Sequence, residues 1–124
     1  MNKSIELEKK FKEQAAIAGL LVEKPKTIVS NHPVEDRNGK IKKTKTLPDC
    51  FVIDPLSQNS MHIEITNGSG RTDHKAAQKR VVEAAGVENY TVITGNQLKE
   101  LCERQTPVEK RLFLLTIFGW LNLL

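Results

Sequence analysis

The sequence MHIEITNGSGRTDHKAAQKRVVEAAGVENYTVIT, which covers residues 61–94, predicts a strand, a helix and a second strand in succession. Apolar and polar side chains alternate over residues 61–66, as they do in a strand with one buried face. A helix is expected over 72–85, because alanine and valine recur on one stripe and Gly86 follows it. The second strand covers 90–94. A strand–helix–strand crossover pairs its two strands in parallel.

The residues before this unit complete an α/β domain. A helix is expected over 4–18, ending at Gly19 or continuing as far as Val22 before the next proline. Short strands are expected at three further places, which are 27–30, 41–48 and 50–53. Asn38-Gly39 is a hairpin signal and predicts an antiparallel pair. The fold class is therefore α/β, with a mixed β-sheet flanked by helices.

A chain of 124 residues is long enough for one domain and too short for two. We expect a single domain over 1–124, with a core over about 4–95 and a helical extension over 96–124. The extension contains a helix at 97–104 and a last helix that begins at Pro107.

The last helix is apolar on almost every face. The apolar stretch from Leu112 to Leu124 is shorter than the ~20 residues that a membrane helix requires. It is therefore expected to pack in the core, in a homodimer interface or against another partner. Leu112, Leu115, Phe118 and Trp120 should be mostly buried, some of them only in a two-fold dimer.

The two cysteines, Cys50 and Cys102, form no CxxC pair and lie in no His/Cys cluster. This pattern indicates a reducing compartment, excludes a structural zinc site and favours two buried thiols. The N-terminal sequence is charged throughout and has no apolar signal region. We therefore expect a cytoplasmic protein that has no membrane partner.

Positive charge is concentrated in two places. The net charge is +4 and the pI about 9.1. One basic cluster precedes residues 46–70 in the sequence, and the other follows them. Basic clusters attract phosphate backbones and release their counterions. The candidate nucleic-acid-binding residues are Lys40, Lys42, Lys43, Lys45, Arg71, Lys79 and Arg80. The alternative is a solvated surface that keeps the protein soluble.

Two acidic residues lie between these basic clusters. Asp49 opens a strand directly after Pro48, and Glu64 lies on the polar face of the next strand. Two carboxylates at neighbouring strand ends predict a site for Mg²⁺ or Mn²⁺, to which the backbone carbonyl of Ile65 adds a third oxygen. Lys75 in the following helix is a candidate for stabilising charge in a transition state. Two alternatives remain, in which Asp49 is a turn residue and Glu64 forms a structural ion pair with Lys75 or Arg80.

The segments PDCFVID (48–54), EIT (64–66) and KAAQKRVVEAAGVENYTVIT (75–94) resemble the PD-(D/E)XK nucleases. The resemblance covers about residues 4–95 and is nearest to the virus-type replication-repair nucleases and the Holliday-junction-resolvase-like branch. It implies a restriction-endonuclease-like core of order αβββαβ, with Asp49 and Glu64 as the acidic residues.

The same resemblance implies further site residues. Gln78 is the active-site glutamine, and Glu8 is the first-helix glutamate, with Glu6 and Glu13 as alternatives. Thr66 stands where the family carries its lysine, and Lys75, one helical turn before Gln78, is the candidate to replace it.

The function expected from these residues is metal-dependent hydrolysis of phosphodiesters, by an endo- or exodeoxyribonuclease that uses Mg²⁺ or Mn²⁺. DNA is a more natural substrate than RNA, in repair, recombination, mobile-element processing or restriction. One alternative is a catalytically inactive relative that binds nucleic acid. Another is a small interaction module that assembles through its apolar C-terminal helix.

Overall fold

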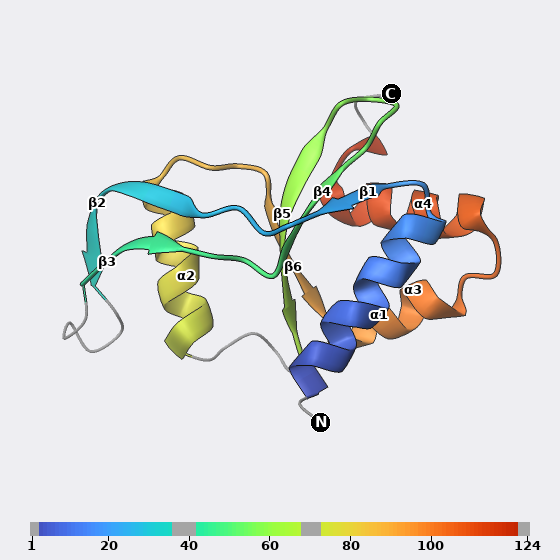
Figure 1. Ribbon diagram of the computed structural model, residues 1–124, viewed down its shortest axis with the longest axis horizontal. Helices are drawn as coiled ribbons and strands as arrows, with labels where there is room; N and C mark the ends of the chain where they lie inside the picture. The colour runs from blue at the N-terminus through green and yellow to red at the C-terminus, as the bar shows by residue number, and fades with distance from the viewer. Residues whose placement is uncertain (1–2, 36–41, 68–72, 122–124) are drawn as a thin grey trace.

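The computed structural model describes residues 3–35, 42–67 and 73–121. Within these residues a first helix is followed by five strands, a second helix, a sixth strand and two further helices (Figure 1). The elements are α1 (Lys3–Ile17), β1 (Leu21–Glu23), β2 (Ile28–Glu35), β3 (Lys42–Thr46), β4 (Cys50–Ile53), β5 (Ser60–Thr66), α2 (Asp73–Ala84), β6 (Tyr90–Thr94), α3 (Gly95–Glu103) and α4 (Pro107–Phe118).

The central sheet is mixed and has the strand order β1-β4-β5-β6. The pairs β1–β4 and β4–β5 are antiparallel, and β5–β6 is parallel. The parallel pair flanks α2 in the sequence, as the strand–helix–strand pattern predicts. The expectation of a mixed sheet flanked by helices is confirmed.

A separate two-stranded ribbon consists of β2 and β3, which pair antiparallel. The chain passes from β1 into β2 and returns from β3 into β4, so the ribbon projects from the sheet as an arm (Figure 1). The predicted antiparallel pair is confirmed. The Asn38-Gly39 turn itself falls within 36–41, outside the described residues.

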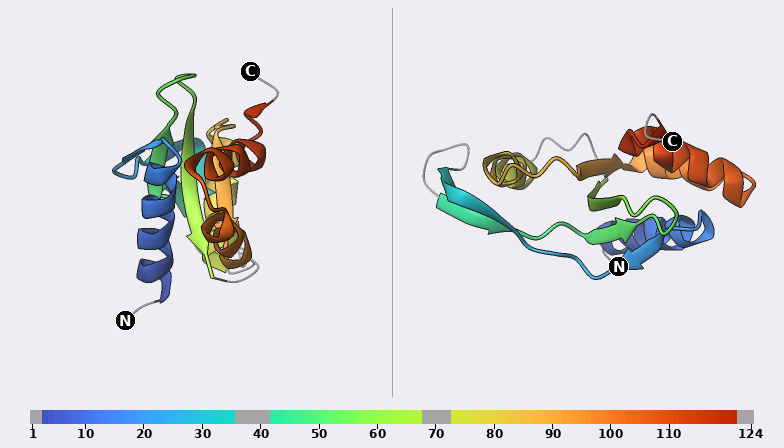
Figure 2. Two further views of the ribbon diagram at one scale, coloured as in Figure 1. Left: turned by 90° about the vertical axis from the view of Figure 1, so that its right-hand side faces the viewer. Right: turned by 90° about the horizontal axis from the view of Figure 1, so that it is seen from above.

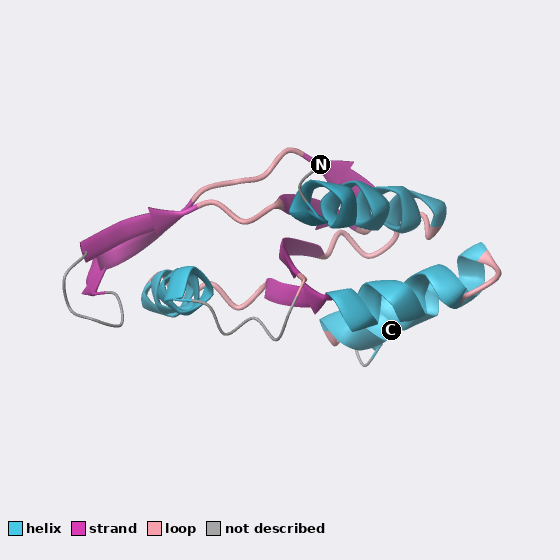
Figure 3. Ribbon diagram, turned by 90° about the horizontal axis from the view of Figure 1, so that it is seen from below, coloured by secondary structure: helices cyan, strands magenta, loops and turns pink. Residues whose placement is uncertain are grey.

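Helices cover both faces of the central sheet. Figure 2 and Figure 3 show α1, α3 and α4 on one face, and α2 with the β2–β3 arm beyond the other. The alternation in β5 explains this division, because Ile63 and Ile65 belong to the main apolar core together with Phe11, Leu98 and Leu114. The opposite side chains of β5 consequently face α2.

The first helix is shorter than its sequence pattern allowed. Gly19 adopts a positive φ of 90°, and the Leu20 N–H donates to the carbonyl of Ala15 in a tight helix end. The option that the helix continues to Val22 is wrong, because Val22 belongs to β1 and pairs with Val52 of β4. A strand of this length carries too little alternation to be recognised from sequence.

The last helix has one buried face and one exposed face. Leu115, Phe118 and Trp120 are buried, as expected, and the Phe118 and Trp120 rings meet edge to face. Leu112 is 48% exposed in the single chain, so its expected burial depends on the predicted dimer. α4 packs against α1 and α3, which cover only one side of it. Within the described part of the chain, no helix is both long and apolar enough to cross a membrane.

Candidate metal and nucleic-acid site

Asp49 lies where the β4–β5 ladder ends. The last paired residues are Cys50 and Ile63, and Pro48 has no N–H with which to continue the ladder. The Asp49 side chain supplies a hydrogen-bond acceptor at this point, since its Oδ2 accepts a hydrogen bond of 2.7 Å from the Ile65 N–H. The carboxylate is thereby held against the end of β5.

The strand register places Asp49 opposite Glu64. The last pair of the ladder is Cys50 with Ile63, and extending the antiparallel register by one residue sets Asp49, before Cys50, against Glu64, after Ile63. Directly opposite residues of an antiparallel pair share a face, with Cβ atoms ~5 Å apart. Glu64 is only 3% exposed and Asp49 is partly buried. Two carboxylates in a poorly solvated site create a negative potential that favours a cation.

Gln78 and Tyr90 lie on the same side of the sheet. Tyr90 in β6 pairs with His62 in β5, so its side chain shares the face of His62 and Glu64. The Tyr90 hydroxyl donates a hydrogen bond of 2.5 Å to Oε1 of Gln78, a residue of α2 that is 1% exposed. Burial, and in smaller part the charge of Asp49, raises the pKa of Tyr90 to about 12. The geometry therefore links α2, β6 and the carboxylate at the end of β4.

Sequence reasoning missed Tyr90. The alternation of β6 was a usable signal, because Tyr90, Val92 and Thr94 pair with His62, Glu64 and Thr66 and must share their face. Only the register of the parallel pair identifies this alignment.

An aromatic and basic group adjoins the carboxylates. Phe51 and His62 are opposite each other, with ring centroids 4.8 Å apart, and the Lys26 ammonium lies 4.4 Å above the Phe51 ring. Burial and then the charge of Lys26 lower the pKa of His62. Phe51 and His62 lie on the same face of the sheet as Asp49 and Glu64. Sequence reasoning selected neither of them, nor Lys26.

Glu8 forms an ion pair of 2.9 Å with Lys12, one turn later in α1. The pKa of Lys12 is raised, first by its hydrogen bond with Glu8, and the charges of Cys50 and Asp49 add to this effect. The structure thus brings Glu8 to the vicinity of β4 in the company of a lysine. Lys12 is a described cation near Asp49 that sequence reasoning missed.

Several predicted basic residues lie partly or wholly outside the described part of the chain. Lys75 belongs to α2 and Lys42 to β3, but neither side chain is described. Lys40 and Arg71 lie outside the described residues altogether.

The remaining basic candidates lie on the arm and on α2. Lys43 and Lys45 of β3 line a groove of about 420 Å³ with Thr27, Thr46 and Leu47. Lys79 and Arg80 are exposed on α2, and the Arg80 guanidinium donates to the Glu35 carbonyl at 2.8 Å. α2 packs closely on β2 and β3, so these positive charges belong to one layer of the molecule.

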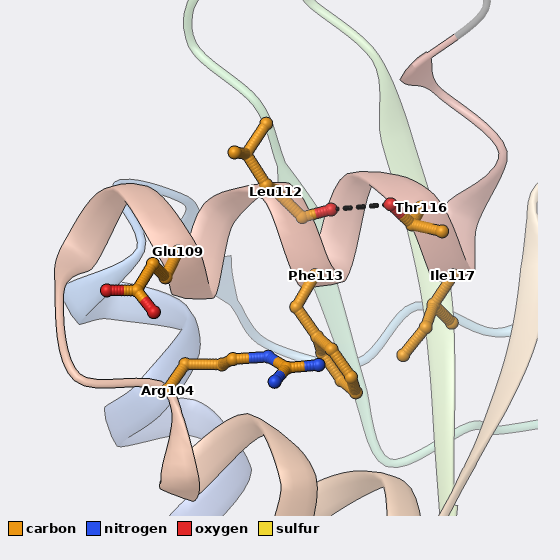
Figure 4. A pocket seen from close by; sticks show the side chains of 6 residues that line it. All are labelled: Arg104, Glu109, Leu112, Phe113, Thr116 and Ile117. Carbon is orange, nitrogen blue, oxygen red and sulfur yellow. Dashed lines mark hydrogen bonds between the residues drawn. The ribbon is translucent and has the colours of Figure 1, made fainter.

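A larger hollow lies beyond the other face of the sheet, between the end of α3 and α4. Its volume is about 450 Å³, and Figure 4 shows the side chains that line it. The Arg104 guanidinium lies 4.9 Å above the Phe113 ring, and the Thr116 hydroxyl donates to the Leu112 carbonyl. This hollow has no acidic pair and is separated from Asp49 and Glu64 by the sheet.

The candidate oxygen donors for a metal belong to Asp49, Glu64 and the Ile65 carbonyl, at the end of the β4–β5 ladder. The Ile65 carbonyl faces the same side as its N–H, which is the side of Asp49. Mg²⁺ is commonly held by one or two carboxylates and keeps several waters, so this donor set fits it. Among the described residues, no group of three or more His, Cys, Asp or Glu side chains is placed to hold a metal ion.

The thiols differ in their surroundings. Burial raises the pKa of Cys50 to about 12, and this residue is fully buried. The expectation of two buried thiols is wrong for Cys102, which is partly exposed on α3.

Comparison with known proteins gives no relative, since no family model, no curated protein and no solved structure matches this chain.

Proposed function

We propose that this protein is a metal-dependent nuclease that hydrolyses phosphodiester bonds in DNA. Its core would be of the restriction-endonuclease type, with β2 and β3 as an insertion. The order α1, β1, β4, β5, α2, β6 supports this, because an antiparallel meander is followed by a helix and a parallel strand.

The observation that carries the proposal is the position of Asp49 opposite Glu64. Asp49 is fixed by the Ile65 N–H, and Glu64 is almost completely buried in the central strand next to it. Two carboxylates on one face of a sheet repel each other when both are charged. The arrangement is favourable when a cation binds there.

Asp49, Glu64 and the Ile65 carbonyl would hold the metal. Bound Mg²⁺ or Mn²⁺ would polarise the phosphate and supply a nucleophilic water at neutral pH. Gln78 and Lys75, which both belong to α2, would orient the substrate. Lys43 and Lys45 on the arm, and Lys79 on α2, would bind backbone phosphates on either side.

A second candidate is a DNA-binding protein of the same fold that does not cleave. It is favoured by Thr66, which stands two residues after Glu64 where the nuclease pattern has a lysine. Binding through the arm and α2 does not depend on that residue.

Cleavage of supercoiled plasmid and of a four-way DNA junction tests the proposal. With Mg²⁺ or Mn²⁺, the intact chain should nick both substrates, and chelation should abolish the reaction. Asp49→Asn and Glu64→Gln should remove cleavage, whereas Glu100→Gln, an equivalent change at an exposed position of α3, should not. DNA binding without cleavage would favour the second candidate. Absence of both would overturn the two proposals.

A further inference from the structure

The Gln78 side chain is buried with only one end of its amide satisfied. It is 1% exposed, and its Oε1 accepts a hydrogen bond from Tyr90. Its Nε2 has no hydrogen-bond partner among the described residues. A buried amide nitrogen without an acceptor is destabilising, so folding by itself does not explain why a glutamine occupies this position.

Tyr90 determines which end of the amide is presented. A protonated phenol donates its hydrogen, and the amide oxygen is the group that accepts it. Burial and the charge of Asp49 raise the pKa of Tyr90 to about 12, so the phenol remains protonated at neutral pH. The amide oxygen is therefore held at Tyr90, and both N–H groups of Nε2 are directed away from it.

The amide belongs to the face that carries the two carboxylates. Tyr90 pairs with His62, two residues before Glu64 on β5, and Asp49 is close enough to influence the Tyr90 hydroxyl electrostatically. A ligand held by Asp49 and Glu64 through a cation would bring its own oxygens to this face. The oxygens of a phosphodiester are acceptors only, and they match a pair of N–H donors.

We propose that Tyr90 is a positioning residue, which holds Gln78 so that its Nε2 donates to a non-bridging oxygen of the bound phosphodiester. This inference rests on the proposed function. The amide contributes direction without charge, so it does not compete with the cation for Asp49 and Glu64. Since the charge on that oxygen grows during phosphoryl transfer, the donor should act more on the rate than on binding.

A double-mutant cycle tests the inference. Tyr90→Phe removes the hydroxyl, Gln78→Leu removes the amide, and the third variant carries both changes. Single-turnover cleavage in Mg²⁺ and DNA affinity without metal are measured for each. Tyr90→Phe should slow cleavage by about 3- to 10-fold, the range for one hydrogen bond, and leave affinity within about 2-fold. The double variant should match Gln78→Leu, because Tyr90 acts only through the amide.

Thr91→Val is the matched control. Thr91 is adjacent on β6, and its hydroxyl donates to the Met61 sulfur on the opposite face of the sheet. Thr91→Val removes a partly buried hydroxyl from the same strand and should leave the cleavage rate unchanged. Thermal unfolding of each variant confirms folding, and Gln78→Met replaces Gln78→Leu if that variant does not fold.

Each result decides a different question. Equal effects of Tyr90→Phe in the presence and absence of the Gln78 amide would overturn the inference and leave the nuclease proposal intact. A slowing by Thr91→Val equal to that by Tyr90→Phe would also overturn it, because the effect would then come from the strand. A wild-type chain that neither binds nor cleaves DNA would overturn the proposed function and this inference with it.

Discussion

The carboxylate of Asp49 accepts a hydrogen bond of 2.7 Å from the main-chain N–H of Ile65, so one side chain closes the end of the β4–β5 ladder. Extending the strand register by one residue sets the same residue opposite Glu64. Asp49 therefore combines a structural hydrogen bond with a proposed role as a metal ligand. Substitutions that separate these two properties are informative.

We expect Asp49→Asn and Asp49→Ala to differ in stability and to agree in activity. Asparagine keeps an oxygen that can accept from Ile65, whereas alanine leaves that N–H without this acceptor, at a cost of about 1–3 kcal/mol. Both variants lose the charge and should lose metal-dependent cleavage. Urea unfolding and plasmid nicking measure the two effects. Retained cleavage in Asp49→Asn would contradict the proposed role of the carboxylate.

Lys75 and Lys79 both belong to α2, but their substitution should affect the cleavage rate and the DNA affinity differently. If Lys75 stabilises charge in the transition state, Lys75→Met should lower the single-turnover rate by about 100-fold or more and change DNA affinity little. Lys79→Met should weaken binding and leave the rate of the bound complex unchanged. A loss of affinity in Lys75→Met as large as its loss of rate would make Lys75 a phosphate contact only.

The arm should contribute salt-dependent affinity with little sequence preference. Each lysine that contacts a phosphate adds about one unit to the slope of log K against log salt. Lys43→Gln with Lys45→Gln should therefore reduce the slope by up to about two for duplex DNA. The control is Lys99→Gln, an exposed lysine of α3 beyond the other face of the sheet. An unchanged slope in the arm variant would exclude the arm from the interface.

The Asp54–Arg111 pair should make stability sensitive to acid. Asp54 is buried, which opposes its charged form, but hydrogen bonds from Arg111, the Leu56 N–H and the Ser57 hydroxyl outweigh burial and lower its pKa. A lowered folded pKa gives stability that is complete above the unfolded value of about 3.9 and is lost as pH falls through the folded value.

Asp54→Asn should accordingly reduce the fall in unfolding free energy below about pH 4. Arg111→Met leaves the buried carboxylate without its cation and should cost on the order of 3 kcal/mol at pH 7. Urea unfolding across the acid range measures both effects. An unchanged acid profile in Asp54→Asn would show that other carboxylates control this transition.

The two faces of α4 should respond differently to substitution. Leu115→Ala removes a buried side chain and should cost about 2–5 kcal/mol, whereas Leu112→Ala, at a half-exposed position, should change stability by less than about 0.5 kcal/mol. Leu112 and Val108 leave apolar surface exposed, through which we expect the chain to form a homodimer. Leu112→Glu should then yield stable monomers in sedimentation velocity. Monomeric wild-type protein would contradict the dimer prediction.

Local sequence was sufficient for the elements that carry a regular pattern. The alternation at 61–66 and 90–94 predicted both strands of the parallel pair, and the residues between them predicted α2. Asp49 and Glu64 could be selected as candidates, because a charged residue next to proline at a strand start and another inside an apolar strand both depart from ordinary core composition. These signals lie within a few residues, where steric and hydrophobic periodicity act directly.

Tertiary structure decided which of these residues meet. The approach of Glu8 and Lys12 to Asp49, the hydrogen bond of Tyr90 to Gln78 and the exposure of Leu112 depend on contacts between elements far apart in the sequence. Each depends on how α1 packs on the sheet, on the register of β5 against its neighbours or on the side of α4 that α1 and α3 cover. A shift of one residue in either strand pairing would move every side chain of that strand to the opposite face. Contacts across the sheet are therefore fixed by packing the whole core, and no local segment contains that information.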